Sequence, residues 1–310
     1  MAAQSLCVAL TGATGFVGRH ILPKLLEAGH TVRALVRDRS KLQTKDARVT
    51  AVIGDLFDPP ALTELCKGAD AVIHVVGIIM EKPRQGQTFQ RVPVEGTANL
   101  LDGARATGRV RKWVHMSALG TRPDAVSTYH RTKWEAEELV RTSGLDFTIF
   151  RPSIIHGPDG EFMQMVKGFW CNWFPPFVPY FGAGAMGGKG AGRLQPVHVD
   201  DVAACFVGAL TNAKARNETY PVGGPEAFTW PDLYRAVQPH LPEARKKKVR
   251  AVPVWYANLI AGKPVVACNN DQVILNPEDS VCETSKLRAD FGIELKAFEP
   301  TVAEYAANIA

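Results

Sequence analysis

A tyrosine and a lysine stand four residues apart in the segment STYHRTKWEAEE at 127–138, and good helix formers follow them. Residues at this spacing share one face of a helix, so the side chains of Tyr129 and Lys133 are predicted to lie close together. A tyrosine normally holds its proton up to about pH 10. A lysine cation nearby stabilises the phenolate, so the pair could give a proton to a developing negative charge. The structural alternative is a partly buried tyrosine beside a solvated lysine.

Short apolar segments alternate with amphipathic ones through the first half of the chain. The apolar segments are rich in β-branched residues and poor in charged ones, as is typical of strands covered on both faces. Strand–helix alternation of this kind predicts an α/β fold with a doubly wound parallel sheet. The predicted strands are 5–10, 31–36, 49–53, 71–76, 112–116 and 146–151, and the predicted helices are 16–28, 60–67, 88–107 and 131–143.

The sequence TGATGFVG at 11–18 follows the first predicted strand and opens the first predicted helix. Gly12 permits a tight turn, Gly15 lets the backbone approach a pyrophosphate, and Gly18 lets the helix pack closely. The helix N-terminus then faces the phosphates. A glycine triplet alone is a weak signal, but its position between a strand and a helix favours a dinucleotide site over a bare structural turn.

Ligands of such sheets bind outside the carboxyl ends of the strands. Ser117, in HMSALG at the end of the fifth predicted strand, and the helix that starts near Tyr129 both point to that edge. A hydride that passes from a reduced nicotinamide to a carbonyl requires a proton at the developing alkoxide. Tyr129 could supply that proton beside Lys133, and Ser117 could hydrogen-bond the same oxygen.

The end of the second strand distinguishes the two nicotinamide cofactors. An acidic residue there binds the ribose 2′-hydroxyl, whereas an arginine can pair with a 2′-phosphate. The strand ends in ALVRDRSK, which places Arg37 at this position and Asp38 next to it. Arg37 favours NADP(H), and NAD(H) is the alternative if Asp38 contacts the ribose. Asp55 and Leu56 are predicted to meet the adenine.

Five motifs, TGATGFVG, GDLFD, HMSALG, YHRTK and RPSIIHGP, occur in the order typical of the short-chain dehydrogenase/reductase superfamily, which the chain resembles over almost its whole length. The resemblance implies a Rossmann fold, a nicotinamide cofactor and the catalytic set Ser117, Tyr129 and Lys133. It also implies a segment that contacts the nicotinamide end of the cofactor. The predicted cofactor contacts are Gly12, Thr14, Gly15, Phe16, Val17, Gly18, Arg37, Asp55, Leu56, Val76, Gly77, Lys133, Pro152, Ser153 and Ile154.

Within the superfamily, the segments HVVGIIMEK, FQRVPVEGTANLLDGA, LQPVHVDDVA and VGGPEAFTWPDL are most similar to an extended, atypical branch that is epimerase/dehydratase-like. This branch includes the nucleotide-binding accessory subunit of respiratory complex I and stand-alone bacterial relatives. In the respiratory complex such a subunit holds NADPH and is not known to turn over a substrate. The chain has no recognisable mitochondrial presequence or signal peptide, so we expect a bacterial cytoplasmic protein, at most peripheral to a membrane.

Regular alternation ends near residue 155, and a smaller, interleaved C-terminal α/β lobe is predicted. Residues 1–155 are expected to form the NAD(P)-binding Rossmann domain, with 194–222 returning to it. Residues 156–193 and 223–310 are expected to form the lobe that meets substrate or partner. Its most unusual segment, 168–188, is rich in aromatic residues, and its three prolines and five glycines argue against a membrane-spanning helix.

Three roles are open for this aromatic segment. It could line a pocket for a hydrophobic substrate, it could dock on a membrane surface or a respiratory-complex partner, or it could form a satellite core under a long loop. The glycines at 182–192, with Lys189 and Arg193, could form a lid. His198 and Asp201 are interpreted as a structural pair that joins the two lobes.

Composition excludes several other classes. The net charge is +5, but both signs are mixed along the chain, and the one basic run, RKKKVR at 245–250, has no aromatic-rich basic stripe with it, so nucleic acid is not expected as a partner. Six cysteines without short pairings and eight histidines without ligand spacing predict neither a disulfide scaffold nor a metal site.

Two functions remain open. The first is an NADPH-dependent oxidoreductase, or an epimerase/dehydratase-like enzyme, that acts through Ser117, Tyr129 and Lys133 on a small substrate, for which the aromatic segment leaves a hydrophobic compound as one option. The second is a non-catalytic accessory or assembly factor that holds NADP(H), or a redox sensor. The intact serine–tyrosine–lysine set favours the first, and the resemblance to the accessory subunit favours the second.

Overall fold

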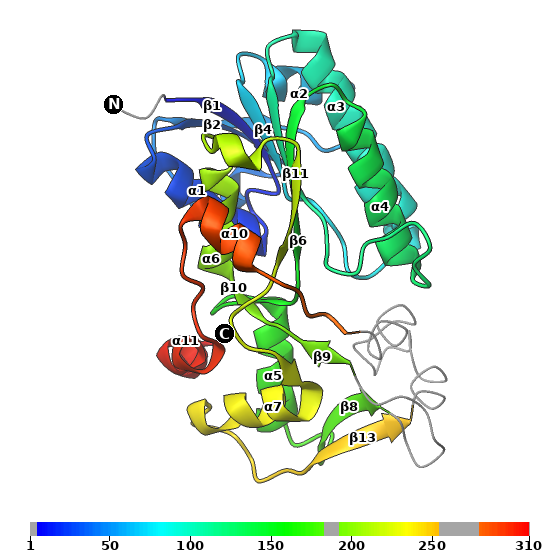
Figure 1. Cartoon of the computed structure of the whole chain (residues 1–310), viewed down its shortest axis with the longest axis vertical. Coiled ribbons are helices and arrows are strands. Elements are labelled where there is room, and N and C mark those ends of the chain that lie inside the picture. The colour runs from blue at the N-terminus through cyan, green and yellow to red at the C-terminus, as the bar shows by residue number, and fades with distance from the viewer. Residues whose placement is uncertain (1–4, 183–191, 254–278, 310) are drawn as a thin grey trace. The chain divides into compact units, whose positions relative to one another are not determined.

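The computed structural model describes residues 5–182, 192–253 and 279–309, and these form two compact units (Figure 1). The first unit comprises Met1–Pro152, Val199–Pro221 and Thr284–Ile293. The second comprises Ser153–His198, Val222–Glu283 and Glu294–Ala310. None of the helices in the described ranges combines the length and the apolar character that a membrane span requires.

A seven-stranded sheet forms the centre of the first unit, in the order β11-β6-β5-β4-β1-β2-β3. The strands from β6 to β3 all pair in parallel. The chain order reverses between β1 and β4, which makes the carboxyl ends of these two strands the switch point where ligands bind. The strands are β1 (Cys7–Thr11), β2 (Thr31–Val36), β3 (Val49–Ile53), β4 (Ala71–His74), β5 (Lys112–Met116), β6 (Asp146–Pro152) and β11 (Glu218–Val222).

Helices cover both faces of this sheet, which is the doubly wound arrangement that the sequence predicted (Figure 1). On one face α2 packs on α3 and α3 on α4, while on the other α1 packs on α6. A π-helical turn at Gln90–Glu95 leads directly into α3. The helices are α1 (Phe16–Glu27), α2 (Pro59–Cys66), α3 (Gly96–Thr107), α4 (Thr128–Arg141), α6 (Val199–Gly208) and α10 (Ser285–Phe291).

Apolar side chains from both layers form the core between the sheet and α2–α4. Trp113 of β5 is fully buried there, with Leu62 of α2 and Leu100 of α3. Gly103 allows the close contact of α3 with α2, because a Cβ at this position would lie 3.0 Å from the Leu62 backbone. The packing therefore fixes the carboxyl edge of the sheet, where the candidate site residues lie.

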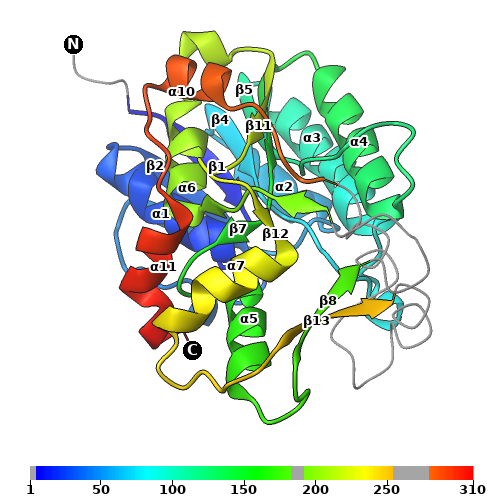
Figure 2. The ribbon, with the colours of Figure 1, turned by 60° about the horizontal axis from the view of Figure 1, so that its bottom comes forward.

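The second unit is built from short elements around its own core (Figure 2). Trp170 of α5 and Val237 of α7 are buried in this core, and Thr229 caps α7 by accepting a hydrogen bond from the Asp232 N–H at 3.3 Å. The elements are β7 (Ile155–His156), α5 (Glu161–Cys171), β8 (Val178–Gly182), β9 (Arg193–Leu194), β10 (Val197–His198), β12 (Phe228–Thr229), α7 (Trp230–Val237), β13 (Val249–Pro253) and α11 (Phe298–Tyr305).

Several segments group differently from the predicted division. Residues 153–155, 194–198 and 222 belong to the second unit, although they were predicted to lie in the Rossmann domain. Thr284–Ile293 belongs to the first unit, although 223–310 was predicted to belong to the smaller lobe. Tyr220 and Asp290 explain the grouping, because the Tyr220 hydroxyl donates to the Asp290 carboxylate at 2.8 Å. The ring of Phe291 also packs on Tyr220 with centroids 5.3 Å apart.

Candidate active site

Glycines shape the turn between β1 and α1. Gly12 has a φ of +79°, in the left-handed region that favours glycine, and its carbonyl accepts a hydrogen bond from the Gly15 N–H at 2.9 Å. A Cβ on Gly18 would lie 2.0 Å from the Gly12 carbonyl oxygen, so a larger residue cannot enter the first turn of α1 without moving the backbone. Gly15 is exposed and presents backbone without a side chain.

The N-terminus of α1 offers hydrogen-bond donors. Its first helical bond runs from the Arg19 N–H to the Gly15 carbonyl, so the N–H groups of Phe16, Val17 and Gly18 lie outside the helical ladder. Such donors, together with the helix dipole, bind anions. The residues present therefore fit a pyrophosphate, which Gly15 to Gly18 would hold. Thr14 and Phe16 are half-buried at the same turn, and Val17 is buried.

Lys133 lies on the buried face of α4, whose N-terminus is capped by Ser127. Its Nζ donates to the Met116 carbonyl at the end of β5, at 3.0 Å. Burial lowers the pKa of Lys133 to about 8, and the Glu137 carboxylate opposes that shift. A Cβ on Gly77 would lie 3.1 Å from the lysine Nζ, so the chain after β4 passes close to this ammonium.

Tyr129 stands one helical turn before Lys133 and is half-buried. Its ring packs edge-on against Phe89, with centroids 5.6 Å apart, and beside His130, at 5.3 Å. Burial raises the pKa of Tyr129 to about 12. Lys133 was predicted to make this hydroxyl a better acid. Burial has the opposite and dominant effect on the pKa of Tyr129, and the lysine ammonium donates to the Met116 carbonyl instead.

Ser117 follows β5 directly and is buried. Its N–H donates to the Phe150 carbonyl at 2.8 Å, and its Oγ donates to the Thr121 Oγ1 at 3.2 Å. Ser117 is thus adjacent in the chain to Met116, whose carbonyl holds Lys133. The structure therefore places Ser117 and Lys133 at the end of the same strand, with Tyr129 one turn away along α4.

Sequence reasoning missed the carboxylate that lies behind Lys133. Glu137 is fully buried, and Arg151 of β6 binds it through two hydrogen bonds of 2.8 and 2.6 Å. Arg141 donates to the same carboxylate at 2.5 Å. Lys133, Glu137 and Arg141 follow one another at four-residue spacing on α4, so the helical period could have identified this row.

A buried histidine was also missed. His74, at the end of β4, shares its Nδ1 with the Thr11 Oγ1 at 2.7 Å and its Nε2 with the Thr97 Oγ1 at 3.2 Å. Burial, and then the Lys133 charge, lower the pKa of His74 to about 3. His74 is therefore neutral at physiological pH, and it joins β1, β4 and α3 beside the lysine. A histidine inside a strand gave no sequence signal for this role.

Arg37 and Asp38 follow β2, and their side chains differ in hydrogen bonding. Arg37 is exposed, and no hydrogen bond or ion pair within the described part of the chain engages it. The Asp38 carboxylate accepts from the Ser40 N–H at 2.9 Å and from the Ser40 hydroxyl at 2.7 Å, and these bonds lower its pKa. The acidic side chain is therefore used within its own turn, while the arginine is available.

A pocket of about 630 Å³ lies at the ends of β2 and β3, and its lining includes Arg37 and Asp55. Asp55 is exposed and accepts from the Phe57 N–H at 2.7 Å. Leu56 is instead buried in the core, where its carbonyl accepts from the Asn99 side chain at 2.9 Å. Val76, after β4, is half-buried against the same core.

The remaining predicted contacts fall in two units. Pro152 ends β6 in the first unit, and its carbonyl accepts from the Leu119 N–H at 2.8 Å. Ser153 and Ile154 belong to the second unit. There the Ser153 hydroxyl donates to the Ser280 carbonyl at 2.8 Å. The structure thus gathers the predicted residues from Gly12 to Pro152 in one unit, whereas Ser153 and Ile154 belong to the other.

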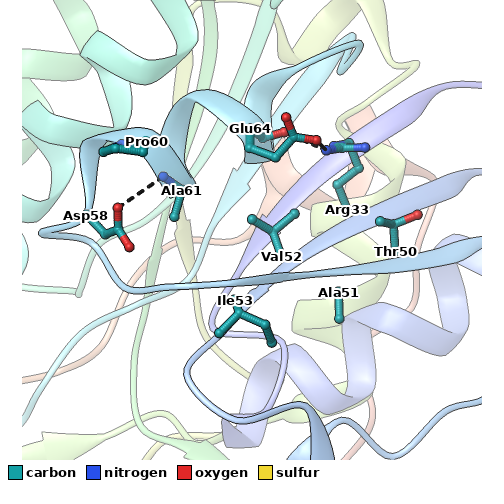
Figure 3. Close-up of a pocket in the computed structure, with 9 residues that line it drawn as sticks. All are labelled: Arg33, Thr50, Ala51, Val52, Ile53, Asp58, Pro60, Ala61 and Glu64. Atoms are coloured by element: carbon teal, nitrogen blue, oxygen red, sulfur yellow. Dashed lines mark hydrogen bonds and ion pairs between the residues drawn. The ribbon is translucent and has the colours of Figure 1, made fainter.

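Another pocket, of about 430 Å³, lies over the outer strand of the sheet (Figure 3). Its lining comes from β2, β3 and the start of α2. Figure 3 shows Arg33 bonded to Glu64, at 2.7 Å, and Asp58 accepting from the Ala61 N–H, at 3.2 Å. These polar groups satisfy one another, so this pocket is not the candidate site.

Comparison with known proteins agrees with the geometry of the glycine turn. The model of the family described as NAD(P)H-binding matches residues 12–167. The chain belongs to this NAD(P)H-binding family. The match begins at Gly12 and includes Ser117, Tyr129 and Lys133.

Relatives of this NAD(P)H-binding protein include both enzymes and respiratory subunits. It is 33% identical to the ceramide reductase of Caulobacter vibrioides over 246 residues, which are 78% of this chain and 73% of that protein. It is 28% identical to the mitochondrial NADH dehydrogenase [ubiquinone] 1 alpha subcomplex subunit 9 of Arabidopsis thaliana over 72% of this chain, a match that spans only 54% of the plant protein.

A solved structure confirms the fold of this family member. A short-chain dehydrogenase/reductase superfamily protein from Agrobacterium tumefaciens, with bound NAD, superposes with a TM-score of 0.70 at 21% identity, over 98% of this chain and 96% of that one. The Rossmann fold that the resemblance to this superfamily implied is therefore confirmed, and the resemblance to complex I subunits is confirmed by the sequence relatives. The chain is an NAD(P)H-binding, reductase-like protein with a Rossmann fold.

Proposed function

We propose that the protein is an NADPH-dependent reductase that converts the carbonyl group of a small hydrophobic substrate to a hydroxyl, with Tyr129 as the proton donor. The observation that carries the proposal is the buried ammonium of Lys133, held at the end of β5 by the Met116 carbonyl and next to Ser117. A desolvated cation with one protein partner is costly, and groups of this kind concentrate at functional sites.

The residues of the site would act as follows. The bound nicotinamide supplies the hydride. The Tyr129 phenol is protonated at neutral pH because its pKa is about 12, so it can donate that proton to the substrate oxygen as negative charge develops there. Lys133, with a pKa of about 8, is largely cationic at neutral pH and stabilises the phenolate that remains. Ser117 would rotate its hydroxyl from Thr121 to the substrate oxygen.

The preference for NADPH is supported by the turn after β2. The exposed guanidinium of Arg37 has no partner among the described residues and lines the pocket that also contains Asp55. Asp38, which could otherwise accept a ribose hydroxyl, is engaged by Ser40. A guanidinium matches a phosphate through paired hydrogen bonds, so the proposal places the 2′-phosphate against Arg37.

The substrate class is supported by the relative named ceramide reductase, which acts, by that name, on a lipid. We propose a hydrophobic carbonyl compound, and a panel of aromatic and long-chain ketones is the suitable first screen. Oxidation of NADPH in the presence of each ketone measures the reaction directly.

Replacing Tyr129 by phenylalanine tests the proposal. Loss of the donor should reduce kcat by about 10² to 10⁴, the usual contribution of general acid catalysis, while the Kd for NADPH changes by less than about threefold. Tyr234→Phe makes the same chemical change at a tyrosine buried in the core of the second unit, and it should leave kcat unaltered. Equal turnover by the wild type and the Tyr129→Phe protein would refute the assigned role of this residue.

A cofactor-holding accessory protein is the second candidate. Its support is the likeness to the complex I subunit and the Tyr129 hydroxyl, which bonds neither Lys133 nor Ser117 within the described residues. This candidate predicts tight NADPH binding with no turnover of any ketone, and full biological activity of the Tyr129→Phe protein.

A further inference from the structure

An aromatic loop and a basic segment lie at the same end of a two-stranded ribbon in the second unit (Figure 2). β8 and β13 are parallel, with Val178 opposite Val249, so both strands begin at one end. The loop 172–177 precedes β8, and the segment 245–248 precedes β13. The Val178 N–H donates to the Lys248 carbonyl at 3.0 Å, so a backbone hydrogen bond joins the segments that lead into the two strands.

The loop exposes two large rings. Trp173 is 77% exposed and Phe174 is 56% exposed, and their ring centroids lie 5.8 Å apart. Trp170, one turn earlier on α5, is by contrast buried in the core. Exposing an adjacent tryptophan and phenylalanine leaves a large apolar area in water, and such contiguous patches mark interaction sites.

Basic side chains hold this loop in place. The Lys247 ammonium donates to the carbonyls of Phe169, Asn172 and Pro175, the first and last at 2.8 Å. The Arg245 guanidinium donates to the Cys171 carbonyl, also at 2.8 Å. These hydrogen bonds fix the backbone that carries the two exposed rings. Binding therefore has a smaller cost in conformational entropy.

The segment that leads into β13 also carries positive side chains without partners among the described residues. Lys246, Lys248 and Arg250 are exposed, and no hydrogen bond or ion pair with a described residue engages them. Glu243 is the one acidic residue between 241 and 250. The segment that is hydrogen-bonded to the ring-bearing loop thus has five basic residues and one acidic residue, and this charge complements an anionic surface.

We propose that this patch, Trp173 and Phe174 with Lys246, Lys248 and Arg250, docks the protein on a membrane surface that contains anionic lipids. Amphipathic rings such as tryptophan settle at the level of the lipid headgroups. Basic residues near an anionic bilayer each strengthen binding by about fivefold, and the two signals together give stable but reversible association. The proposal requires neither the cofactor nor the reaction proposed above.

Vesicle co-sedimentation of the full chain tests the proposal. Wild-type protein should bind vesicles of phosphatidylglycerol and phosphatidylcholine at least tenfold more tightly than vesicles of phosphatidylcholine alone, and added salt should weaken the binding. Trp173→Ser with Phe174→Ser should reduce binding by tenfold or more. Lys246→Gln, Lys248→Gln and Arg250→Gln together should reduce it by about 100-fold on the anionic vesicles.

Two matched controls distinguish the patch from general effects. Val126→Ser removes an aliphatic side chain that is 66% exposed in the first unit, and Lys67→Gln with Arg105→Gln and Arg109→Gln removes three positive charges there. Both controls should bind vesicles like the wild type. Equal binding to neutral and anionic vesicles, or equal loss in the controls, would overturn the proposal. So would a wild-type dimer that Trp173→Ser with Phe174→Ser dissociates, because the patch would then join two copies.

Discussion

Lys133 is the residue on which the chemistry of the site depends. Its ammonium is almost completely buried, and one carbonyl accepts a hydrogen bond from it. The Glu137 carboxylate on the same helix compensates part of the desolvation, yet the pKa still falls to about 8. A charge kept under these conditions costs stability, which is the pattern expected where a cation serves a bound ligand rather than the fold.

This cost should appear in the pH dependence of stability. The folded-state pKa of Lys133 is about 8 and its ordinary value is 10.5, so the unfolded chain binds more protons between these values. Stability of the wild type relative to Lys133→Met should therefore rise by about 2–3 kcal/mol from pH 7 to pH 10. Urea unfolding of both proteins at the two pH values measures this. A constant difference would show that the lysine is not desolvated.

Arg37 should determine the choice of cofactor. Arg37→Gln removes the guanidinium from the pocket beside Asp55 and should weaken NADPH binding by about 10- to 100-fold, the usual effect of losing charged hydrogen bonds. NADH lacks the 2′-phosphate, so its affinity should stay within about twofold. Titration of both cofactors by calorimetry gives the comparison. Parallel losses for NADPH and NADH would assign Arg37 to a structural role instead.

At the scale of the element, α4 is the helix that organises the site. Its Ser127 cap fixes where the helix begins, and its buried row presents Lys133 to β5 and Glu137 to β6. The Glu137 carboxylate thus compensates the positive charges of Lys133 and Arg141 on the same helix and of Arg151 on β6. The helix was predicted from its composition, but the burial of Glu137 was not, because a glutamate at this position is equally typical of a solvated face.

The buried carboxylate gives a sharp prediction at this scale. Glu137→Gln leaves the Arg141 and Arg151 guanidinium groups without their buried anion and should destabilise the protein by about 3–5 kcal/mol. Its neighbour Glu138 pairs with Arg141 at the surface and is 46% exposed, so Glu138→Gln should cost less than about 1 kcal/mol. Chemical denaturation of the two variants tests the difference, and equal costs would contradict the proposed network.

At the scale of the whole molecule, periodicity predicted the part of the fold that local sequence controls. The strands at 31–36, 49–53 and 112–116 have the predicted bounds because each is followed by a polar or turn residue, Arg37, Gly54 or Ser117. The dinucleotide turn was recognisable because Gly12 and Gly18 each meet a backbone constraint that another residue would violate. Both features are short-range.

Long-range packing accounts for what the sequence did not reveal. α10 is a short helix with little local signal, and it joins the first unit because Asp290 and Phe291 meet Tyr220, seventy residues away. Neighbouring aromatic residues also differ in burial, because Trp170 is buried in the core and Trp173 is exposed. The predicted lid at 182–192 falls mostly on residues 183–191, which lie outside the described ranges.

The central claim is that a nicotinamide dinucleotide binds along the Gly12–Gly18 turn with its reactive ring beside Tyr129. A crystal structure of the protein with NADPH tests it most directly. We predict pyrophosphate oxygens at the N–H groups that begin α1, the 2′-phosphate at Arg37, and the nicotinamide C4 within about 5 Å of the Tyr129 hydroxyl, close enough for both transfers to one carbonyl group. A ring bound away from Tyr129 and Lys133, or no bound dinucleotide at saturating NADPH, would contradict the account.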